Sequence, residues 1–408
     1  MPLLFSKGPP MRQRPVSLLY VLFLAYFTFG MMYVLGALTP EVIAQYNLSR
    51  FAAGLLGSAF YFAYTVCAIP TGMMMDRVGG RPIILAGVLL MGLGCLVVSN
   101  AHSYPLILAM VFAVGVGVTM LQTSGNPLIQ QLDVPANYDR NLTLTIGFAG
   151  FGPFFAPFVL TYIRSTGRPW QTLYLFFAVV CLGALILLAF SKFPPRIQSA
   201  ERVQWGKVGQ LLRNPLILAY TFGIFFYVAA EVGTAFWIPK FFEDVHGVPA
   251  TVASNPGAGL MGRVFPSLPS LIFALFWGLQ GSGRLVSGAV LKRFGSRNIL
   301  RAFSVMALLC LLVATFGSKT LTAVGFATCG LFSSVLFTLI FSGTINSFAE
   351  NHGTISGVLC TAVLGGALIP PLEGLVGDHL GMRVAMLVPA LCFAYVVGLA
   401  MWGRAKYE

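Results

Sequence analysis

The chain has 408 residues, of which 57% are hydrophobic and only 9% are charged. Soluble domains carry about 25% charged residues, because their surfaces must be solvated. The composition therefore excludes a soluble fold and indicates an integral membrane protein. A net charge of +13 would suggest nucleic acid binding in a soluble chain. Here the charge is explained by topology, and no nucleic-acid partner is expected.

Long apolar stretches follow one another along the chain, separated by Pro, Gly and charged clusters. The first follows Lys7, Arg12 and Arg14 and exceeds the apolar core of a signal peptide, so we interpret it as a retained span. A helix crosses the bilayer in about 20 residues, whereas barrel strands alternate over about ten. We predict an all-α membrane protein with twelve transmembrane helices, at 17–38, 52–75, 82–99, 104–132, 141–163, 172–191, 215–239, 267–291, 298–317, 321–349, 354–377 and 383–403.

The basic residues are unequally divided between the two sides of the predicted bundle. With the N-terminus inside, most of the 25 Lys and Arg residues fall on inner segments. The positive-inside rule then predicts that both termini are cytoplasmic. The expected location is multi-pass, in the plasma (inner) membrane, with the lipid bilayer as the surroundings.

The longest polar inner stretch lies between the sixth and seventh spans, at residues 192–214. It predicts a cytoplasmic linker between an N-terminal six-helix half, residues 1–191, and a C-terminal half, residues 215–408. No P-loop, His-Glu-x-x-His motif or Cys/His cluster occurs. We therefore expect no enzyme, no metal ion and no other cofactor.

A short motif recurs at the ends of three spans. Residues 72–81 read GMMMDRVGGR and residues 288–297 read GAVLKRFGSR, while the degenerate copy at 374–383 reads GLVGDHLGMR. Each copy joins a helix-packing Gly to a tight turn and basic residues. Two parallel six-helix repeats are typical of transporters with a binding site at the midplane.

The motif and the twelve-span layout resemble the major facilitator superfamily over the whole chain. In that family, the Asp and Arg after the second span latch the cytoplasmic ends of the two halves in the outward-open state. The resemblance assigns this gating role to Asp76, Arg77 and Arg81, and the second copy adds Lys292 and Arg293. The alternative, that the arginines only set topology, does not explain an acid at Asp76.

Several segments are similar to a narrower branch, the fucose–glucose–galactose:proton symporters. This resemblance implies import of a neutral, hexose-like solute together with a proton. Members of that branch carry acids in the first and fourth spans, where this chain has Gly36, with its apolar neighbours, and Gln122. The similar segments are 57–72, 123–132, 225–233, 330–342 and 356–381.

Glu231 lies in the middle of the seventh span. A charge there costs at least about 2.5–3.5 kcal/mol, which makes it a functional candidate. Desolvation disfavours its charged form, so we predict that Glu231 is the proton-coupling group; the alternatives are a structural hydrogen bond or a pair with Arg284. Arg284 is expected at the inner gate, or snorkelling toward the cytoplasm. Glu373 is expected at a solvated outer helix end, with an outer-gate role as the alternative.

A neutral polyol requires amides and aromatic surfaces in a largely apolar cavity. Gln122 and Asn126 are four residues apart and share a helix face, and Gln280 and Asn346 lie deep in spans eight and ten. An unpaired amide in hydrocarbon costs several kcal/mol, so these four are predicted substrate contacts. Each aromatic candidate has packing as its alternative role. The predicted aromatic contacts are Tyr33, Tyr61, Tyr227 and Trp277, and the further candidates are Tyr26, Tyr64 and Trp237.

These features together predict a secondary active transporter that moves a small polar solute by alternating access. A monosaccharide is the expected substrate, a proton the expected coupling ion and a monomer the expected state. One alternative is an uncoupled facilitator or an exporter of amphipathic compounds on the same fold. The other is a non-transporting membrane sensor, which we would expect to carry an extra soluble domain or a long tail.

Overall fold

The computed structural model describes residues 16–132, 138–194, 213–250, 264, 266–348 and 352–403. All regular elements in these ranges are helices, which confirms the all-α prediction. The elements are α1 (Val16–Met31), η1 (Met32–Val34), α2 (Leu35–Tyr46), α3 (Arg50–Val78), α4 (Gly80–Val98), α5 (Tyr104–Leu132), α6 (Tyr138–Ser165), α7 (Thr172–Phe190), α9 (Pro215–His246), α11 (Leu268–Phe294), α12 (Ser296–Phe316), α13 (Lys319–Ser333), α14 (Leu336–Ile345), α15 (His352–Thr361), η3 (Ala362–Leu364), α16 (Gly365–Leu380), α17 (Met382–Ala385) and α18 (Leu387–Trp402).

Eleven helical stretches of the described chain are long and apolar enough to cross a membrane. The remaining predicted span, 267–291, is also a helix, α11, but its apolar run is interrupted by Gln280, Ser282 and Arg284. Polar residues within a span are tolerated where they face the protein interior. Gln280, Ser282 and Arg284 of α11 are therefore expected to face the interior of the bundle.

Two spans extend well beyond their predicted ends: the first, predicted to end at residue 38, continues to Tyr46, and the seventh was predicted to end at Pro239. α9 continues to His246, because one proline removes only one helix hydrogen bond and the apolar residues beyond it remain packed. Phe241 and Phe242 are fully buried there. The helix ends where Gly247 adopts a left-handed conformation, with φ of 63°.

Three spans that border the candidate site are not continuous α-helices, and a fourth, the twelfth, is divided into α17 and α18 at Met386. The first changes to a 3-10 turn at η1, and the eleventh does the same at η3. The tenth is divided into α13 and α14 at residues 334–335. Irregular backbone at membrane depth is tolerated where it is buried in protein or lines a cavity. All three irregularities belong to helices that surround the candidate site.

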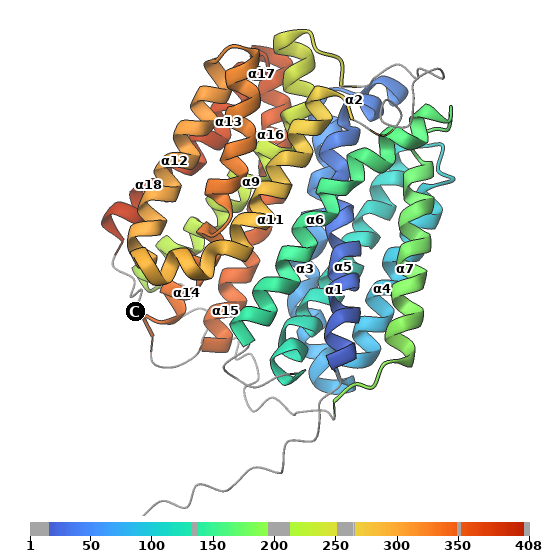
Figure 1. The fold of residues 1–408 in the computed structure, drawn as a ribbon, viewed down its shortest axis with the longest axis vertical. Helices are drawn as coiled ribbons and strands as arrows, with labels where there is room; N and C mark the ends of the chain where they lie inside the picture. Colours follow the sequence, from blue (N-terminus) through green and yellow to red (C-terminus); the bar gives the residue numbers. More distant parts are fainter. Residues whose placement is uncertain are drawn as a thin grey trace, which may run out of the picture.

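The helices form two groups, with α1–α7 on the right of Figure 1 and α9–α18 on the left. The most extensive contacts between the groups are made by α3 with α16, α6 with α11, and α2 with α9. Most of the predicted linker, residues 195–212, lies outside the described residues. The candidate site lies where the two groups meet.

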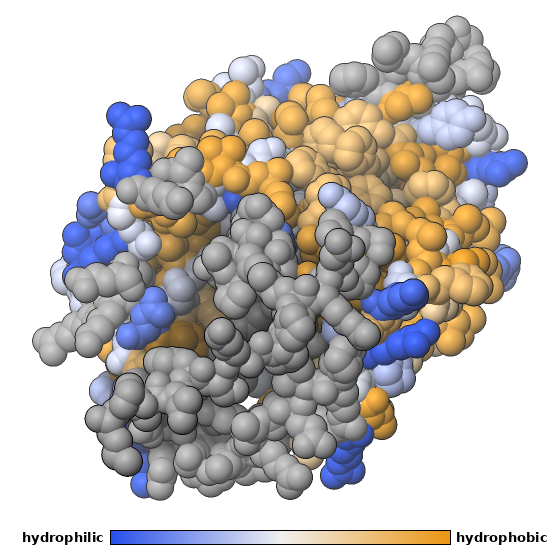
Figure 2. Space-filling model, turned by 60° about the horizontal axis from the view of Figure 1, so that its bottom comes forward, coloured by the Kyte–Doolittle hydropathy of each residue, from blue (hydrophilic) through white to orange (hydrophobic). Residues whose placement is uncertain are grey.

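The exterior of the bundle is apolar. Seen from the lower end, hydrophobic side chains cover the flanks and hydrophilic ones gather around the rim (Figure 2). Phe190 and Trp402 are 86% and 81% exposed. Such exposure would be unfavourable in water, so these flanks are the lipid-facing surface of a multi-pass membrane protein.

All three copies of the repeated motif form the same turn. Gly79, Gly295 and Gly381 have φ of 91°, 77° and 85°, and each is a single residue between two helices. This region of backbone space is essentially restricted to glycine. The glycine in the motif therefore makes a one-residue reversal between consecutive spans, including the degenerate copy.

Candidate functional site

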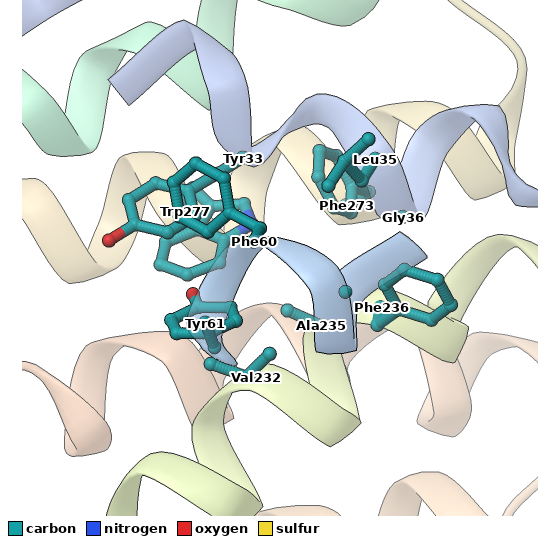
Figure 3. Close-up of a pocket in the computed structure, with 11 residues that line it drawn as sticks. Tyr33, Leu35, Gly36, Phe60, Tyr61, Val232, Ala235, Phe236, Phe273 and Trp277 are labelled. Atoms are coloured by element: carbon teal, nitrogen blue, oxygen red, sulfur yellow. The ribbon is translucent and has the colours of Figure 1, made fainter. Parts of the chain in front are cut away.

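A small cavity lies between the two helix groups (Figure 3). Its walls come from η1 and α2, α3, α9 and α11, and the space open to water-sized molecules is about 20 Å³. That volume holds about one water, far below the several hundred Å³ of a formed ligand pocket. The two halves are thus closed around this point. The lining residues are Tyr33, Leu35, Gly36, Gly57, Phe60, Tyr61, Val232, Ala235, Phe236, Phe273 and Trp277.

Three of the predicted aromatic contacts form a stack across the two halves. The rings of Tyr33 and Trp277 are 5.1 Å apart and nearly parallel, at 11°, and Tyr61 stacks on Tyr33 at 6.0 Å and 23°. Figure 3 shows the rings of Tyr33 and Trp277 overlapping, with the Tyr61 hydroxyl directed toward them. Tyr33 is the middle residue of η1, so the local change in helix type sets its direction.

Glu231 forms a polar cluster with three of the predicted residues. Its Oε1 accepts hydrogen bonds from the Tyr227 hydroxyl and the Gln280 amide, and Arg284 Nη2 lies 3.5 Å away. Trp277, Gln280 and Arg284 are spaced three and four residues apart and share one face of α11. The structure therefore brings the carboxyl, the amide and the aromatic stack to one place.

The break between α13 and α14 supports this cluster. The Tyr227 hydroxyl also lies 2.8 Å from the Ser333 carbonyl oxygen, so its single proton is shared between that carbonyl and Glu231. Arg284 Nε donates to the carbonyl of Ser334 at 3.1 Å. Both carbonyls are at the break, where the helix pattern ends. Arg284 is thus held beside Glu231, which agrees with the pairing of these two residues that was predicted from the sequence as one alternative.

Several polar atoms at this point have no hydrogen-bond partner among the described residues. They include Trp277 Nε1, Gln280 Oε1 and Ser334 Oγ. Trp277 is only 5% exposed and Gln280 is fully buried. Buried polar groups are normally paired, so these atoms are suited to partners on a bound solute.

The other predicted amides lie elsewhere. Asn126 accepts a hydrogen bond from the Tyr26 hydroxyl at 2.5 Å, which joins α5 to α1 in the N-terminal half. Gln122 is half-buried one turn away on α5. Asn346 follows α14 at the end predicted to be inner, about 18 Å along the helix from Ser334 at 1.5 Å per residue. It is not brought next to Glu231.

The end of the molecule predicted to be outer is closed by ion pairs between the halves. Arg50 at the start of α3 bonds Asp378 of α16 at 3.1 Å and Asp244 of α9 at 2.9 Å. Asp378 also accepts the backbone N–H groups of Arg50 and Phe51, at 3.0 and 3.1 Å. An acid from one half thus caps the first turn of a helix in the other.

Further from this end of the molecule, α3 and α16 pack closely against each other. A Cβ on Gly54 would lie 2.6 Å from Pro371 Cα, and one on Gly374 would lie 2.4 Å from the Arg50 carbonyl oxygen. Ser58 donates a hydrogen bond to the Ala367 carbonyl, which lacks a helix partner because Pro371 has no N–H. We name these α3–α16 contacts the outer seal. It comprises Arg50, Phe51, Gly54, Ser58, Ala367, Pro371, Gly374 and Asp378.

Sequence reasoning missed Arg50, Asp244 and Asp378. The available signal was an acid within the degenerate motif copy and charges on the side that is otherwise poor in them. The partners are 194 and 328 residues apart. Their pairing required the tertiary structure.

The predicted inner latch has no contact between the halves among its described side chains. Arg81 donates to the Ala189 carbonyl at 2.8 Å and lies over the Phe193 ring, both in its own half. Arg77 is exposed, and Arg293 lies over the neighbouring Phe294 ring. The side chains of Asp76 and Lys292 lie outside the described residues.

Glu373 differs from its expected environment. We expected a solvated helix end, but the side chain is fully buried. Neither carboxyl oxygen has a hydrogen-bond partner among the residues that the structure describes. Packing of α16 against both α3 and α9 excludes water there.

No group of three or more His, Cys, Asp or Glu residues suited to a metal ion occurs within the described chain. The ionisable residues of the site instead form hydrogen bonds with one another or with backbone carbonyls.

Bacterial proteins named as sugar transporters align with almost the whole chain. A glucose/galactose transporter of Brucella abortus (strain 2308) is 28% identical, over 93% of this chain and 92% of its own. The L-fucose-proton symporter of Escherichia coli (strain K12) is 26% identical, over 88% and 86%. Both relatives are transporters and not enzymes, and as bacterial proteins they imply an inner-membrane location.

Solved structures show the same fold. The transporter FucP in its outward conformation has a TM-score of 0.69 at 22% identity, over 97% of this chain and all of that one. A bacterial homologue of the lysosomal transporter Spinster, inward-facing and occupied, has a TM-score of 0.72 at 16% identity, over 96% and 97%. Residues 18–363 match the model of one family. The chain belongs to the Major Facilitator Superfamily.

Proposed function

We propose that this protein transports a neutral monosaccharide together with a proton, by alternating access. The observation that carries the proposal is the Tyr33–Trp277 stack, which joins the two halves beside Glu231 and polar atoms without protein partners. Relatives named as glucose/galactose transporters and as an L-fucose-proton symporter support the substrate class. A sugar presents apolar C–H faces and hydroxyl groups, which match an aromatic surface and unpaired donors and acceptors.

In this mechanism Tyr33, Tyr61 and Trp277 separate as the halves part, and the sugar ring takes the place of the ring–ring contacts. Gln280 Oε1 accepts a hydrogen bond from one sugar hydroxyl, and Trp277 Nε1 donates a hydrogen bond to the oxygen of another. Gln122 and Asn126 provide contacts from the N-terminal half, while Tyr227 positions Glu231. Asn346 stays a predicted contact without structural support.

Glu231 is the proposed proton carrier. As a carboxylate it attracts Arg284 across 3.5 Å and accepts from Tyr227 and Gln280. Protonation removes the charge attraction to Arg284 and changes which atoms of Gln280 face the sugar. Proton and sugar thereby act on the same amide, and a shared contact of this kind is a physical means of coupling.

Alternating access requires opposite ends to open in turn. The outer seal is closed in this structure, through the contacts of Arg50 and Asp378. The proposed latch for the opposite state consists of Asp76, Arg77 and Arg81 with Lys292 and Arg293. Arg284 links this gating to the site, since it bonds both Glu231 and the backbone between α13 and α14.

The decisive experiment replaces Glu231 by Gln in proteoliposomes. We expect uphill sugar uptake driven by a pH gradient to fall at least tenfold, because the variant cannot carry a proton. Counterflow exchange of sugar should persist. Glu243→Gln is the matched control, since Glu243 is a half-exposed acid that pairs with Lys240 on the same helix.

If Glu231→Gln accumulates sugar as the parent protein does, Glu231 is not the carrier. If the parent protein itself moves sugar down its gradient but never against it, the coupled mechanism is wrong and the uncoupled facilitator is right. The absence of acids at Gly36 and Gln122 makes this the relevant comparison.

A second candidate function is export of amphipathic compounds. It is favoured by the apolar part of the cavity, where Phe60, Phe236 and Phe273 line the wall. A panel of sugars and amphiphiles separates the two, because the sugar transporter should show saturable flux with sugars alone. Flux with amphiphiles and none with sugars would support the exporter.

A further inference from the structure

Glu373 is a buried acid for which the proposed function has no role. It lies on α16, is fully buried, and neither of its oxygens has a partner among the described residues. A Cβ added at Gly233 of α9 would lie 2.1 Å from Glu373 Oε1. The chain therefore has a glycine at a position of α9 where any side chain would displace this carboxyl.

The groups around Glu373 do not neutralise a negative charge. On α18 the ionisable neighbour is the Cys392 thiol, and on α9 the nearest acid along the chain, Glu231, bonds Tyr227 and Gln280. On the α3 side the charged group is Arg50, whose guanidinium is held by Asp378 and Asp244. An unpaired carboxylate in such a place costs several kcal/mol, whereas a protonated acid costs far less.

The turn that carries Glu373 is also the turn that the outer seal covers. Pro371 and Gly374 lie on either side of it in sequence, and both are in close contact with α3. Trp237 of α9 donates to the Pro370 carbonyl at 3.1 Å, and Ser58 of α3 donates to the Ala367 carbonyl. Two consecutive prolines weaken the helix at this level, so departure of α3 removes contacts that hold this turn in place.

We propose that Glu373 is a second proton-binding site, distinct from Glu231, that takes up a proton before the outer seal closes. A proton from the outer solution binds one carboxylate oxygen when α3 has separated from α16. Closure then buries the neutral acid against Gly233. The same proton returns to water, and the carboxylate re-forms, when the turn is uncovered again. This inference rests on the alternating access of the proposed function.

A direction of pH dependence follows. The closed state binds the proton more tightly than the open state, so acid on the outer side favours closure. This pH dependence is separate from the role of Glu231, which belongs to the polar cluster with Tyr227 and Gln280. A structural acid that never exchanges its proton would show no such dependence.

The test is infrared spectroscopy of the full-length protein in lipid, measured without sugar and without transport. At neutral pH, exposed acids are ionised, so the carboxylic C=O stretch reports buried protonated acids. We expect Glu373→Gln to abolish a component of this band that Glu231→Gln and Glu243→Gln retain. An unchanged band in Glu373→Gln overturns the proposal.

A second variant tests exchange with the outer solution. Asp378→Asn leaves Glu373 in place but weakens the outer seal, and should reduce the Glu373 component by about half if open and closed states become equally populated. When spin-label distances show that the outer ends have separated in Asp378→Asn, a component that does not respond at any pH would identify a permanently neutral structural acid and refute the proposal. If Glu373→Gln does not fold, Gly233→Ala serves, because it displaces the carboxyl and should shift the same component.

These measurements are independent of the sugar. If none of the variants loses uphill uptake, the proposed function is contradicted, while the carboxylic band of Glu373 is unaffected. Conversely, a coupled transporter whose carboxyl band does not depend on Glu373 would retain the proposed function and lose this inference.

Discussion

Trp277 is the residue at which the two halves and the polar cluster meet. Its ring stacks on Tyr33 of the other half, its Nε1 has no partner among the described residues, and Gln280 lies one turn further along the same helix. Aromatic pairs are worth about 0.5–1.5 kcal/mol beyond the area that they bury, and a hydrogen bond about 1 kcal/mol. These magnitudes allow the two roles of Trp277 to be separated.

Replacing Trp277 by Phe should raise the apparent KM for sugar about fivefold, because the ring remains and one donor is lost. Replacing it by Ala should raise KM by more than tenfold, because the stacking surface is lost as well. Uptake kinetics over a range of sugar concentrations measure both. Trp402→Phe is the control, since Trp402 is 81% exposed on the lipid face. Equal effects of Phe and Ala would exclude a stacking role.

Among the elements, the α3–α16 pair shows how the degenerate motif copy is used. Its first glycine, Gly374, lets α16 approach the α3 backbone, its acid, Asp378, caps α3, and its last glycine, Gly381, turns the chain into α17. Figure 1 shows α17 at the upper end of the molecule, next to the outer ends of the bundle. The motif thus forms a contact at the opposite end from the copy at residues 72–81.

Asp378→Asn should destabilise the outer seal, because it removes a charge-assisted pair with Arg50 and weakens the cap of α3. Such bonds contribute about 1.5–3 kcal/mol, so the outward-open population should rise at least tenfold. Distances between spin labels on the outer ends of the halves measure this. Glu243→Gln should leave the distances unchanged, because its partner Lys240 lies on the same helix and keeps its second ion pair, with Asp244 at 3.1 Å. A closed distribution in both variants would show that packing alone holds the seal.

At the scale of the whole molecule, two helix groups meet along α3 and α16, α6 and α11, and α2 and α9. The polar cluster belongs to the C-terminal group, while Tyr33 and Tyr61 come from the N-terminal group. A movement that separates the groups must divide the aromatic stack. This arrangement makes the site sensitive to the relative position of the halves.

A disulfide across the outer seal tests this dependence. Arg50 N and Asp378 Oδ1 are 3.0 Å apart, so the two positions are adjacent, and we expect Arg50→Cys with Asp378→Cys to cross-link on oxidation, which a labelling assay for free thiols checks first. Oxidation should abolish transport and a reductant should restore it, because the outer end cannot open while linked. Each single variant should be insensitive to oxidation. Transport that continues in the oxidised pair would contradict alternating access through this end.

The sequence by itself determined the membrane class, the spans and the family resemblance, because apolar length and charge asymmetry are local properties that the bilayer selects directly. It also made Glu231, Gln280, Arg284 and Trp277 candidates, since polar groups in an apolar span are conspicuous, and the structure places Gln280 and Arg284 beside Glu231. Only the tertiary structure decided the outer seal and the burial of Glu373. Those features depend on helices far apart in the chain, and whether a charge is paired, solvated or sealed depends on what packs against it.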